Sequence, residues 1–282
     1  MEPNAPELKY LAFEREANGV CHLRLNRPEK LNSWTQAMWS EFGAFGASIA
    51  EDDSIRALVI SGNGRAFSSG IDTAAFATGL LNGDSPNPAA GSFPLMDEHP
   101  LTNLILNLAS TYHWLADAAF PTIAAVHGYA LGAGLQLALA CDIRLFAHGT
   151  TVGLIEHQYG MLPDLGGTQR LPRVVGAAMA KYLIWSAAKI DDEEAFRIGL
   201  CQQRVPQEEL IERALEIADR IASQPPLAVR GVKRVIQASS PTYDAASGAV
   251  EARQQTYCLE SDDFSEAMMA FLEQRAPEYR GK

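Results

Sequence analysis

Two glycine-bearing turns contain backbone N–H groups that could stabilise a negatively charged oxygen. One turn is Phe67-Ser68-Ser69-Gly70, and the other is Leu131-Gly132-Ala133-Gly134, which leads into an apolar segment typical of a helix. N–H groups in tight turns and at helix starts have no partner within their own element. Two of them directed at one oxygen form an oxyanion hole without any charged side chain. Each turn taken alone is equally compatible with a purely structural role.

The spacing of other reactive residues excludes several kinds of site. The six histidines include no HxxxH pair, no GxSxG motif occurs, and GYALGAG lacks the GxGxxG spacing of a dinucleotide-binding loop. The four cysteines are far apart and form no CxxC pair. We therefore expect no metal site and no resident cofactor, and we expect reduced thiols and a cytoplasmic location.

Strands and helices must flank the two turns to position them. Apolar runs predict strands at residues 20–25, 57–60, 123–126 and 143–146. The third of these strands leads into the second turn, and an apolar helix follows from about residue 135. Because strand, glycine-rich turn and helix recur along the chain, the pattern indicates a spiral-like α/β arrangement.

The helical pattern divides the chain into two portions. The sequence pattern of residues 33–50 predicts an early helix with Ser33 as its N-cap. From about residue 208 onward the pattern is helical only. We therefore expect a core of strands and helices at 1–207 and a helical portion at 208–282.

Composition and charge restrict the possible partners. The chain has 282 residues, 47% of them hydrophobic, which is enough for a large core. The formal net charge of −11 and the lack of a basic run argue against a nucleic-acid partner. No apolar run is long enough to predict a membrane span. An acidic surface repels polyanions, so a phosphate-bearing ligand would need a local basic cluster such as Arg24, Arg27 and Lys30.

Five segments resemble the enoyl-CoA hydratase/isomerase (crotonase) superfamily, and they occur in the order found in that family. They are LNRPEKLN, SGNGRAFSSGID, PTIAAVHGYALGAGLQLALACDIRL, GGTQRLPRVVG and DDEEAFRIGL. The resemblance extends from about Val20 to the C-terminus. It implies an α/β fold, a crotonase-like spiral of ββα repeats with a helical C-terminal trimerisation portion. It also implies a homotrimer or dimer of trimers and an acyl-CoA substrate, so that coenzyme A would enter as part of the substrate.

The resemblance gives the two turns a function. It implies that the backbone N–H groups of Ser69 and Ala133 form the oxyanion hole, which would stabilise the enolate of an acyl-CoA thioester.

A second set of residues resembles the CoA-binding part of the family. Ser68, Gly70 and Asp72 match its adenine-binding loop, and Arg27 and Lys30 are the candidate basic residues nearby. Asp72 could instead cap the helix that follows it.

The acid–base positions depart from the family's hydratases. Those enzymes hold a water between two glutamates, whose positions correspond here to Gln136 and Glu156. A glutamine cannot exchange a proton at neutral pH, although it can orient a water or the substrate. Glu156 alone could remove a proton from one carbon and return it to another, as a double-bond shift requires. Glu156 could also be a surface carboxylate at the end of a strand.

Asp164 is a candidate second acid–base group. It lies eight residues after Glu156 and just before Leu165-Gly166-Gly167. In the family's dienoyl-CoA isomerases an aspartate has this same offset and works with the glutamate. Those enzymes also have an acidic residue at the position of Gln136, so the match is partial. Asp164 could instead be an N-cap or turn residue before the glycine pair.

We therefore expect an enoyl-CoA (dienoyl-CoA) isomerase-type enzyme of fatty-acid metabolism. Glu156 and Asp164 would move the proton, and Gln136 would position substrate or water. One alternative is an enoyl-CoA hydratase in which Gln136 holds the water and Glu156 works alone. The other is a non-catalytic acyl-CoA binding protein, a possibility raised by the loss of one glutamate.

Overall fold

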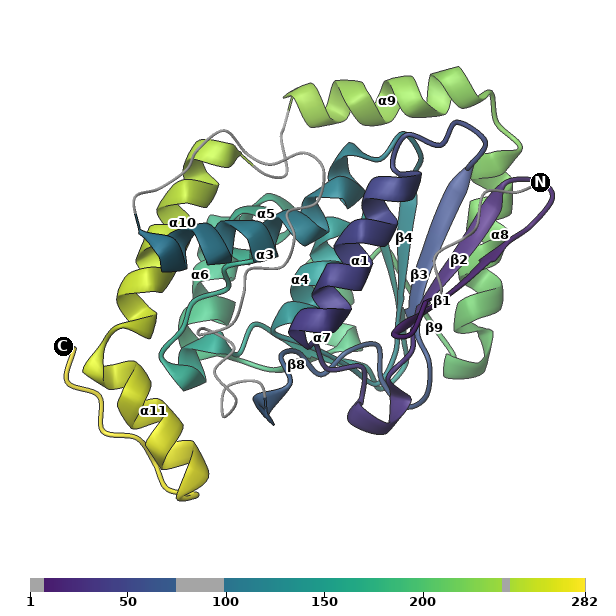
Figure 1. The fold of residues 1–282 in the computed structure, drawn as a ribbon. Coiled ribbons are helices and arrows are strands. Elements are labelled where there is room, and N and C mark those ends of the chain that lie inside the picture. The colour runs from purple at the N-terminus through teal and green to yellow at the C-terminus, as the bar shows by residue number, and fades with distance from the viewer. Residues whose placement is uncertain (1–7, 75–98, 240–243, 282) are drawn as a thin grey trace.

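The computed structural model describes residues 8–74, 99–239 and 244–281, and its centre is a six-stranded sheet (Figure 1). The strand order is β1-β2-β3-β4-β6-β9, with β1 antiparallel to β2 and every other neighbouring pair parallel. The strands are β1 (Leu11–Arg15), β2 (Val20–Leu25), β3 (Ala57–Gly62), β4 (Thr122–Val126), β6 (Ile143–Ala147) and β9 (Gln203–Val205). All four strands predicted from the sequence are therefore present.

A smaller sheet of three strands lies beside the large one. It contains β5 (Tyr129–Leu131), β7 (Thr151–Gly153) and β8 (Ile190–Asp191) in the order β5-β7-β8. The chain passes from β4 in the large sheet to β5 in the small sheet within a few residues. This step leads directly into the second glycine-bearing turn and α4 (Ala133–Ala140).

The two faces of the large sheet pack against different helices. Side chains alternate along a strand, so Leu58 and Ile60 of β3 join the cluster that contains α1 (Gln36–Ile49) and α3 (Pro100–Asp117). Ala57 and Val59 face the opposite side, where α8 (Leu210–Ala222) packs. The first long helix of the predicted 208–282 portion therefore shares a hydrophobic core with the sheet.

The remaining C-terminal helices leave the sheet. They are α9 (Pro226–Ser239), α10 (Ala245–Leu259) and α11 (Asp262–Leu272). α10 packs along α3, where the hydroxyls of Thr102 and Thr256 form a buried hydrogen bond of 2.8 Å. α11 extends away from the sheet (Figure 1). Among the described residues, no helix is long and apolar enough to cross a bilayer.

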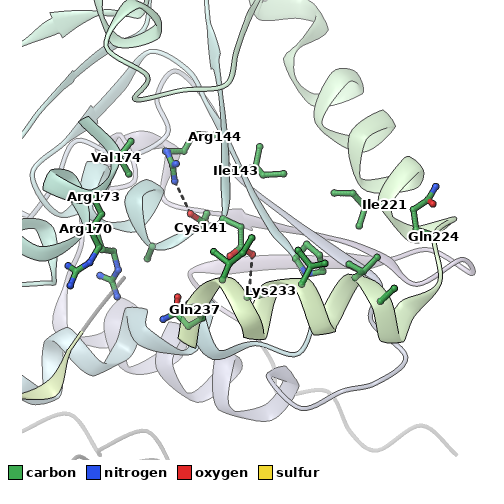
Figure 2. A pocket seen from close by; sticks show the side chains of 18 of the residues that line it. Cys141, Ile143, Arg144, Arg170, Arg173, Val174, Ile221, Gln224, Lys233 and Gln237 are labelled. Atoms are coloured by element: carbon green, nitrogen blue, oxygen red, sulfur yellow. Dashed lines mark hydrogen bonds and ion pairs between the residues drawn. The ribbon is translucent and has the colours of Figure 1, made fainter. Parts of the chain in front are cut away.

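α9 lies over a cavity of about 720 Å³ (Figure 2). Lys233 attaches this helix to the core, since its Nζ donates to Asp142 Oδ2 at 2.9 Å and to the backbone carbonyls of Leu115 and Phe120. Apolar side chains of α9, such as Val229 and Val232, line the cavity.

The start of the first long helix corrects the sequence prediction. Thr35, not Ser33, is the N-cap of α1, because Thr35 Oγ1 accepts a hydrogen bond from the Met38 N–H at 3.3 Å. The Ser33 N–H instead donates to the Lys30 carbonyl within the preceding turn. The other elements are η1 (Pro28–Lys30), η2 (Glu156–Tyr159), α5 (Gly167–Val175), α6 (Ala177–Ser186), α7 (Asp192–Arg197) and η3 (Gln207–Glu209).

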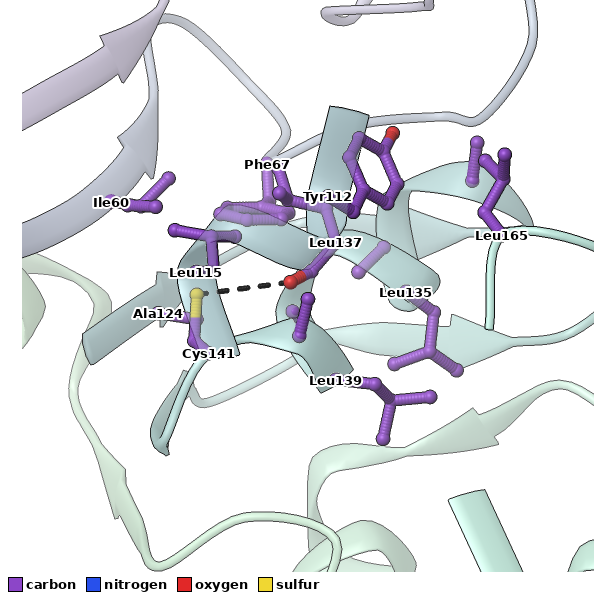
Figure 3. Packing of buried hydrophobic residues seen from close by; sticks show 14 of the residues in the cluster. Ile60, Phe67, Tyr112, Leu115, Ala124, Leu135, Leu137, Leu139, Cys141 and Leu165 are labelled. Atoms are coloured by element: carbon purple, nitrogen blue, oxygen red, sulfur yellow. Dashed lines mark hydrogen bonds between the residues drawn. The ribbon is translucent and has the colours of Figure 1, made fainter. Parts of the chain in front are cut away.

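Figure 3 shows the side chains of α4 among those of the buried hydrophobic cluster. All eight residues of α4 are buried, and the helix packs against Tyr112 and Leu115 of α3 and against Phe67. At its end the Cys141 thiol donates to the Leu137 carbonyl at 3.7 Å. This packing fixes the position of the turn from which α4 starts.

Candidate active site

The two glycine-bearing turns lie against each other. The Ser68 N–H donates to the Tyr129 carbonyl at 2.9 Å, and the Leu131 N–H donates to the Ser68 carbonyl at 3.1 Å. Gly70 has a φ of +99°, and a Cβ at this position would lie 2.9 Å from the Leu131 carbonyl oxygen and 3.8 Å from the Ala133 nitrogen. Ser68 and Gly70 therefore join the two turns, and only glycine permits so close an approach.

Ala133 offers one unpaired donor at this junction. It is the first residue of α4, and its N–H has no acceptor in the part of the chain that the structure describes. This N–H group is the one that the sequence resemblance assigns as an oxyanion donor.

The N–H group predicted as the donor of the other turn is already used. The Ser69 N–H donates to the Leu31 carbonyl at 2.9 Å, so it is not available to a ligand. Gly70 and Asp72 both bond to the backbone of Trp34, and Ile71 between them points its N–H the other way. Within the described residues the Ile71 N–H has no acceptor, which makes it the available donor. The alternation of a strand-like segment is the signal that could have identified it.

Glu156 lies against the second turn. It begins η2, is 5% exposed, and its Oε1 accepts a hydrogen bond from Gln136 Nε2 at 2.8 Å. A Cβ at Gly132 would lie 3.3 Å from this same oxygen. Oε2 is buried and has no hydrogen-bond partner among the described residues. Burial raises the pKa of Glu156 to about 7, against a smaller lowering by hydrogen bonds, so this carboxyl can accept a proton near neutral pH.

Gln136 connects Glu156 to the turn that begins α5. Besides donating to Glu156, its side chain accepts the N–H groups of Leu165 at 2.8 Å and Gly167 at 3.0 Å. A glutamate could accept these two N–H groups but could not donate to a Glu156 carboxylate. The glutamine is thus matched to its neighbours.

Asp164 shares a cavity with the first turn. The cavity, of about 30 Å³, is lined by Ile71, by Asp164 and Gln255 as its polar members, and otherwise by apolar side chains. Burial first, and then the negative charges of Glu251 and Glu156, raise the pKa of Asp164 to about 8. The role of Asp164 as N-cap is not observed, since Gly166 is the N-cap of α5.

Glu251 is a buried carboxylate that the sequence did not indicate. It lies on α10, where Oε1 accepts the Gly166 N–H at 2.8 Å and Oε2 accepts the Thr168 hydroxyl. Burial raises its pKa to about 6. Because Glu251 follows Asp164 at a great distance in sequence, within a helix without a distinctive motif, only the fold brings the two together.

The candidate CoA-binding residues lie next to the first turn. Arg27 Nη2 forms a salt bridge of 3.0 Å with Asp72 Oδ2, and Asp72 Oδ1 also accepts the Ala74 N–H at 3.1 Å. The second contact agrees with the alternative that Asp72 caps the following segment. Lys30 is exposed on η1.

The site just described is distinct from the cavity under α9. Neither Glu156, Gln136 nor Asp164 lines that larger cavity. The residues that the structure describes include no group of three or more potential metal ligands.

Comparison with known proteins is consistent with this geometry. The family model described as enoyl-CoA hydratase/isomerase matches residues 15–91 and 95–282. The chain belongs to this family. The fold class predicted from the sequence, an α/β crotonase-like spiral with a helical C-terminal portion, is thereby confirmed.

Relatives of the chain carry hydratase names. The chain is 34% identical to enoyl-CoA hydratase domain-containing protein 2 of Mus musculus, covering 98% of this chain and 90% of the relative. It is also 34% identical to 2,3-dehydroadipyl-CoA hydratase of Escherichia coli, covering 93% and 96%.

Solved structures give the same grouping. An enoyl-CoA hydratase/isomerase from Pseudoalteromonas atlantica matches with a TM-score of 0.80 at 25% identity, over 96% of this chain and all of that one. An enoyl-CoA hydratase from Bacillus anthracis matches with a TM-score of 0.72 at 32% identity, over 97% of this chain and all of that one.

Proposed function

We propose that this family member is an enoyl-CoA isomerase that shifts a double bond along the acyl chain, with a dienoyl-CoA as the preferred substrate. The observation that carries the proposal is the fixed state of Gln136, whose side chain is held by three hydrogen bonds. Two ionisable side chains, Glu156 and Asp164, then remain to move a proton. A double-bond shift needs one group to remove a proton and another to deliver one.

The oxyanion hole of the proposed reaction consists of the Ile71 and Ala133 N–H groups. They donate to the thioester carbonyl oxygen and stabilise the negative charge that develops on it. This stabilisation acidifies protons along the conjugated chain.

Proton transfer then follows from the states of the two carboxyls. Glu156, ionised, takes a proton from one carbon, and the electrons of that C–H bond pass into the dienolate. Asp164, protonated near neutral pH, gives a proton to a different carbon, and the dienolate becomes the isomerised thioester. Passage of one proton from Glu156 to Asp164 restores the starting state.

Hydration is the second candidate function, and the names of the relatives favour it. The unpaired Glu156 Oε2 and the second N–H of Gln136 Nε2 could hold a water between them. Asp164 has no part in hydration, so a change at Asp164 distinguishes the two functions experimentally.

Asparagine in place of Asp164 tests the proposal. Asp164→Asn should lower the isomerisation rate on dienoyl-CoA about 100-fold and change hydration of 2-enoyl-CoA far less. Glu156→Gln should abolish both reactions while acyl-CoA binding, measured by calorimetry, persists. The matched control is Asp117→Asn, because Asp117 is an exposed aspartate at the end of α3. An Asp164→Asn enzyme with unchanged isomerisation would remove Asp164 from the mechanism.

The remaining proposals concern ligand, assembly and location. We propose that Arg27, Lys30, Ser68, Gly70 and Asp72 contact the CoA moiety, and that the chain forms a homotrimer or a dimer of trimers. Exposed aromatic side chains support assembly, among them Trp185 of α6 at 69% exposure. The four cysteines are free thiols, which supports a cytoplasmic location.

A further inference from the structure

We infer that Glu251 of helix α10 is a positioning residue. It holds residues 162–168, here called the Asp164 loop, in place, and it sets a third carboxyl group beside Asp164 and Glu156. The inference rests on the proposed function in so far as Asp164 and Glu156 are the groups that react. Glu251 does not line the cavity that Asp164 shares with Ile71, so it acts through its neighbours.

Two helices hold the Asp164 loop through its backbone and one hydroxyl. Gln136 of α4 accepts the N–H groups of Leu165 and Gly167, and Glu251 of α10 accepts the Gly166 N–H and the Thr168 hydroxyl. Four successive residues are thus bound alternately by two helices. The N–H groups of Gly166 and Gly167 belong to the start of α5, where the helix itself supplies no acceptor.

Helix α10 holds the loop on both sides of Asp164. Gln255, one helical turn after Glu251, accepts the Leu162 N–H at 2.9 Å. Asp164 therefore lies between two backbone positions, 162 and 166, that are both fixed to α10. α10 is in turn held along α3 by packing and by the Thr102–Thr256 hydrogen bond.

Glu251 also places a carboxylate charge in a buried position. It is 5% exposed, and the charged groups around it are the carboxyls of Asp164 and Glu156 and the guanidinium of Arg170 on α5. A negative charge here disfavours ionisation of Asp164 and so favours the protonated form that the proposed reaction needs. Arg170 acts in the opposite sense on Glu251.

The Glu251→Gln variant removes the negative charge of this side chain but keeps its size and its hydrogen bond to the loop. The glutamine keeps the size of the side chain and an oxygen that can accept the Gly166 N–H, and the Thr168 hydroxyl can turn to donate or accept. Titration of the Asp164 carboxyl by carbon-13 NMR should show its pKa lowered by about one unit in Glu251→Gln. The alkaline limb of the pH–rate profile should move by the same amount, with the maximal rate changed only a few-fold.

Glu251→Ala removes the charge and both hydrogen bonds. We expect the same shift in the Asp164 titration and, in addition, a loss of maximal rate of about tenfold or more because the loop is no longer fixed. The matched control is Glu260→Gln, which removes a carboxylate at the exposed end of the same helix, where Glu260 pairs with His99. It should leave the titration of Asp164 unchanged.

The NMR measurement does not depend on turnover. A shifted Asp164 titration in a protein that isomerises no dienoyl-CoA would uphold the role of Glu251 and refute the proposed function. An active enzyme whose Asp164 titration is the same in wild type, Glu251→Gln and Glu251→Ala would overturn the role of Glu251 and leave the proposed function standing.

Discussion

At the scale of single residues, Gln136 determines what the site can do. Its amide donates to Glu156 and accepts two N–H groups from the turn before α5, so it acts as a connector between the base and the Asp164 loop. An amide side chain suits this position because it combines a donor and an acceptor. In the proposed reaction, Glu156 and Asp164 therefore transfer the protons.

The pH dependence of kcat/KM is predicted from these carboxyls. Glu156 must be ionised, and its pKa of about 7 gives a rate that rises with pH through that value. Asp164 must be protonated, and its pKa of about 8 gives a rate that falls above it. We expect a bell-shaped profile with its maximum between these values, and loss of the alkaline limb in Asp164→Asn. A profile that only rises with pH would contradict the role of Asp164.

The sequence predicts some residues of the site better than others. Gln136, Glu156 and Asp164 could be located because each lies within or beside a segment that resembles the family. The Ser69 N–H is not available because it already donates to the Leu31 carbonyl, a contact between segments that are distant in sequence. Glu251 could not be found, since its role comes from the packing of α10 against distant residues.

At the scale of elements, the close approach of the two turns is the feature on which the oxyanion hole depends. Gly70 is one point of close contact, and any side chain there would push against the Leu131 carbonyl. The two turns are distant in sequence. The distance between them in space is set by the packing of α4, which starts at the second turn and contacts the core residue Phe67 of the first.

Gly70→Ala should disrupt this contact. Both Gly70 and Gly149 have positive φ, but a Cβ at Gly149 would have nothing within 4 Å, so Gly149→Ala is the matched control. Each variant should lose about 1–2 kcal/mol of stability from backbone strain. Only Gly70→Ala should lose activity, by about 100-fold, because it displaces the donors. Equal activities of the two variants in a steady-state assay would mean that the spacing of the turns is unimportant.

The elements themselves were largely predictable. The buried strands were found because their apolar runs end at glycine-bearing turns, and the 123–126 strand, β4, was placed to within one residue. The start of α1 was misplaced because Ser33 and Thr35 are both good caps. Only the observed hydrogen bond to Met38 distinguishes them.

At the scale of the whole molecule, the C-terminal helices belong to the site as well as to the surface. α8 covers one face of the sheet, and α10 brings Glu251 and Gln255 to the Asp164 loop. A boundary near residue 207 marks a change of pattern in the sequence, but the hydrophobic core continues across it. Sequence patterns describe local periodicity and cannot report such contacts.

The three buried carboxyls predict how stability depends on pH. Burial raises the pKa values of Glu156, Asp164 and Glu251 to about 7, 8 and 6. A carboxyl whose pKa is higher in the folded state favours folding while protonated, so this stability is lost as pH rises through those values. The lowered pKa values of His22, His113 and His157 act in the opposite sense below about pH 7, so the carboxyls dominate only above it. The free energy of unfolding, measured with urea, should fall by about 1–2 kcal/mol between about pH 7 and pH 8.5. Glu251→Gln should reduce this fall, and an increase across this range would contradict the burial of these groups.

The proposed isomerase activity is tested most directly by offering the purified protein 2-enoyl-, 3-enoyl- and 3,5-dienoyl-CoA in oxygen-18 water. Ultraviolet absorbance reports the position of the double bonds, and mass spectrometry reports uptake of the label. We predict isomerisation of the dienoyl substrate without label in the acyl chain. Label uptake on 2-enoyl-CoA, with no double-bond shift in the 3-enoyl and 3,5-dienoyl substrates, would contradict the proposed isomerase activity and identify the protein as a hydratase.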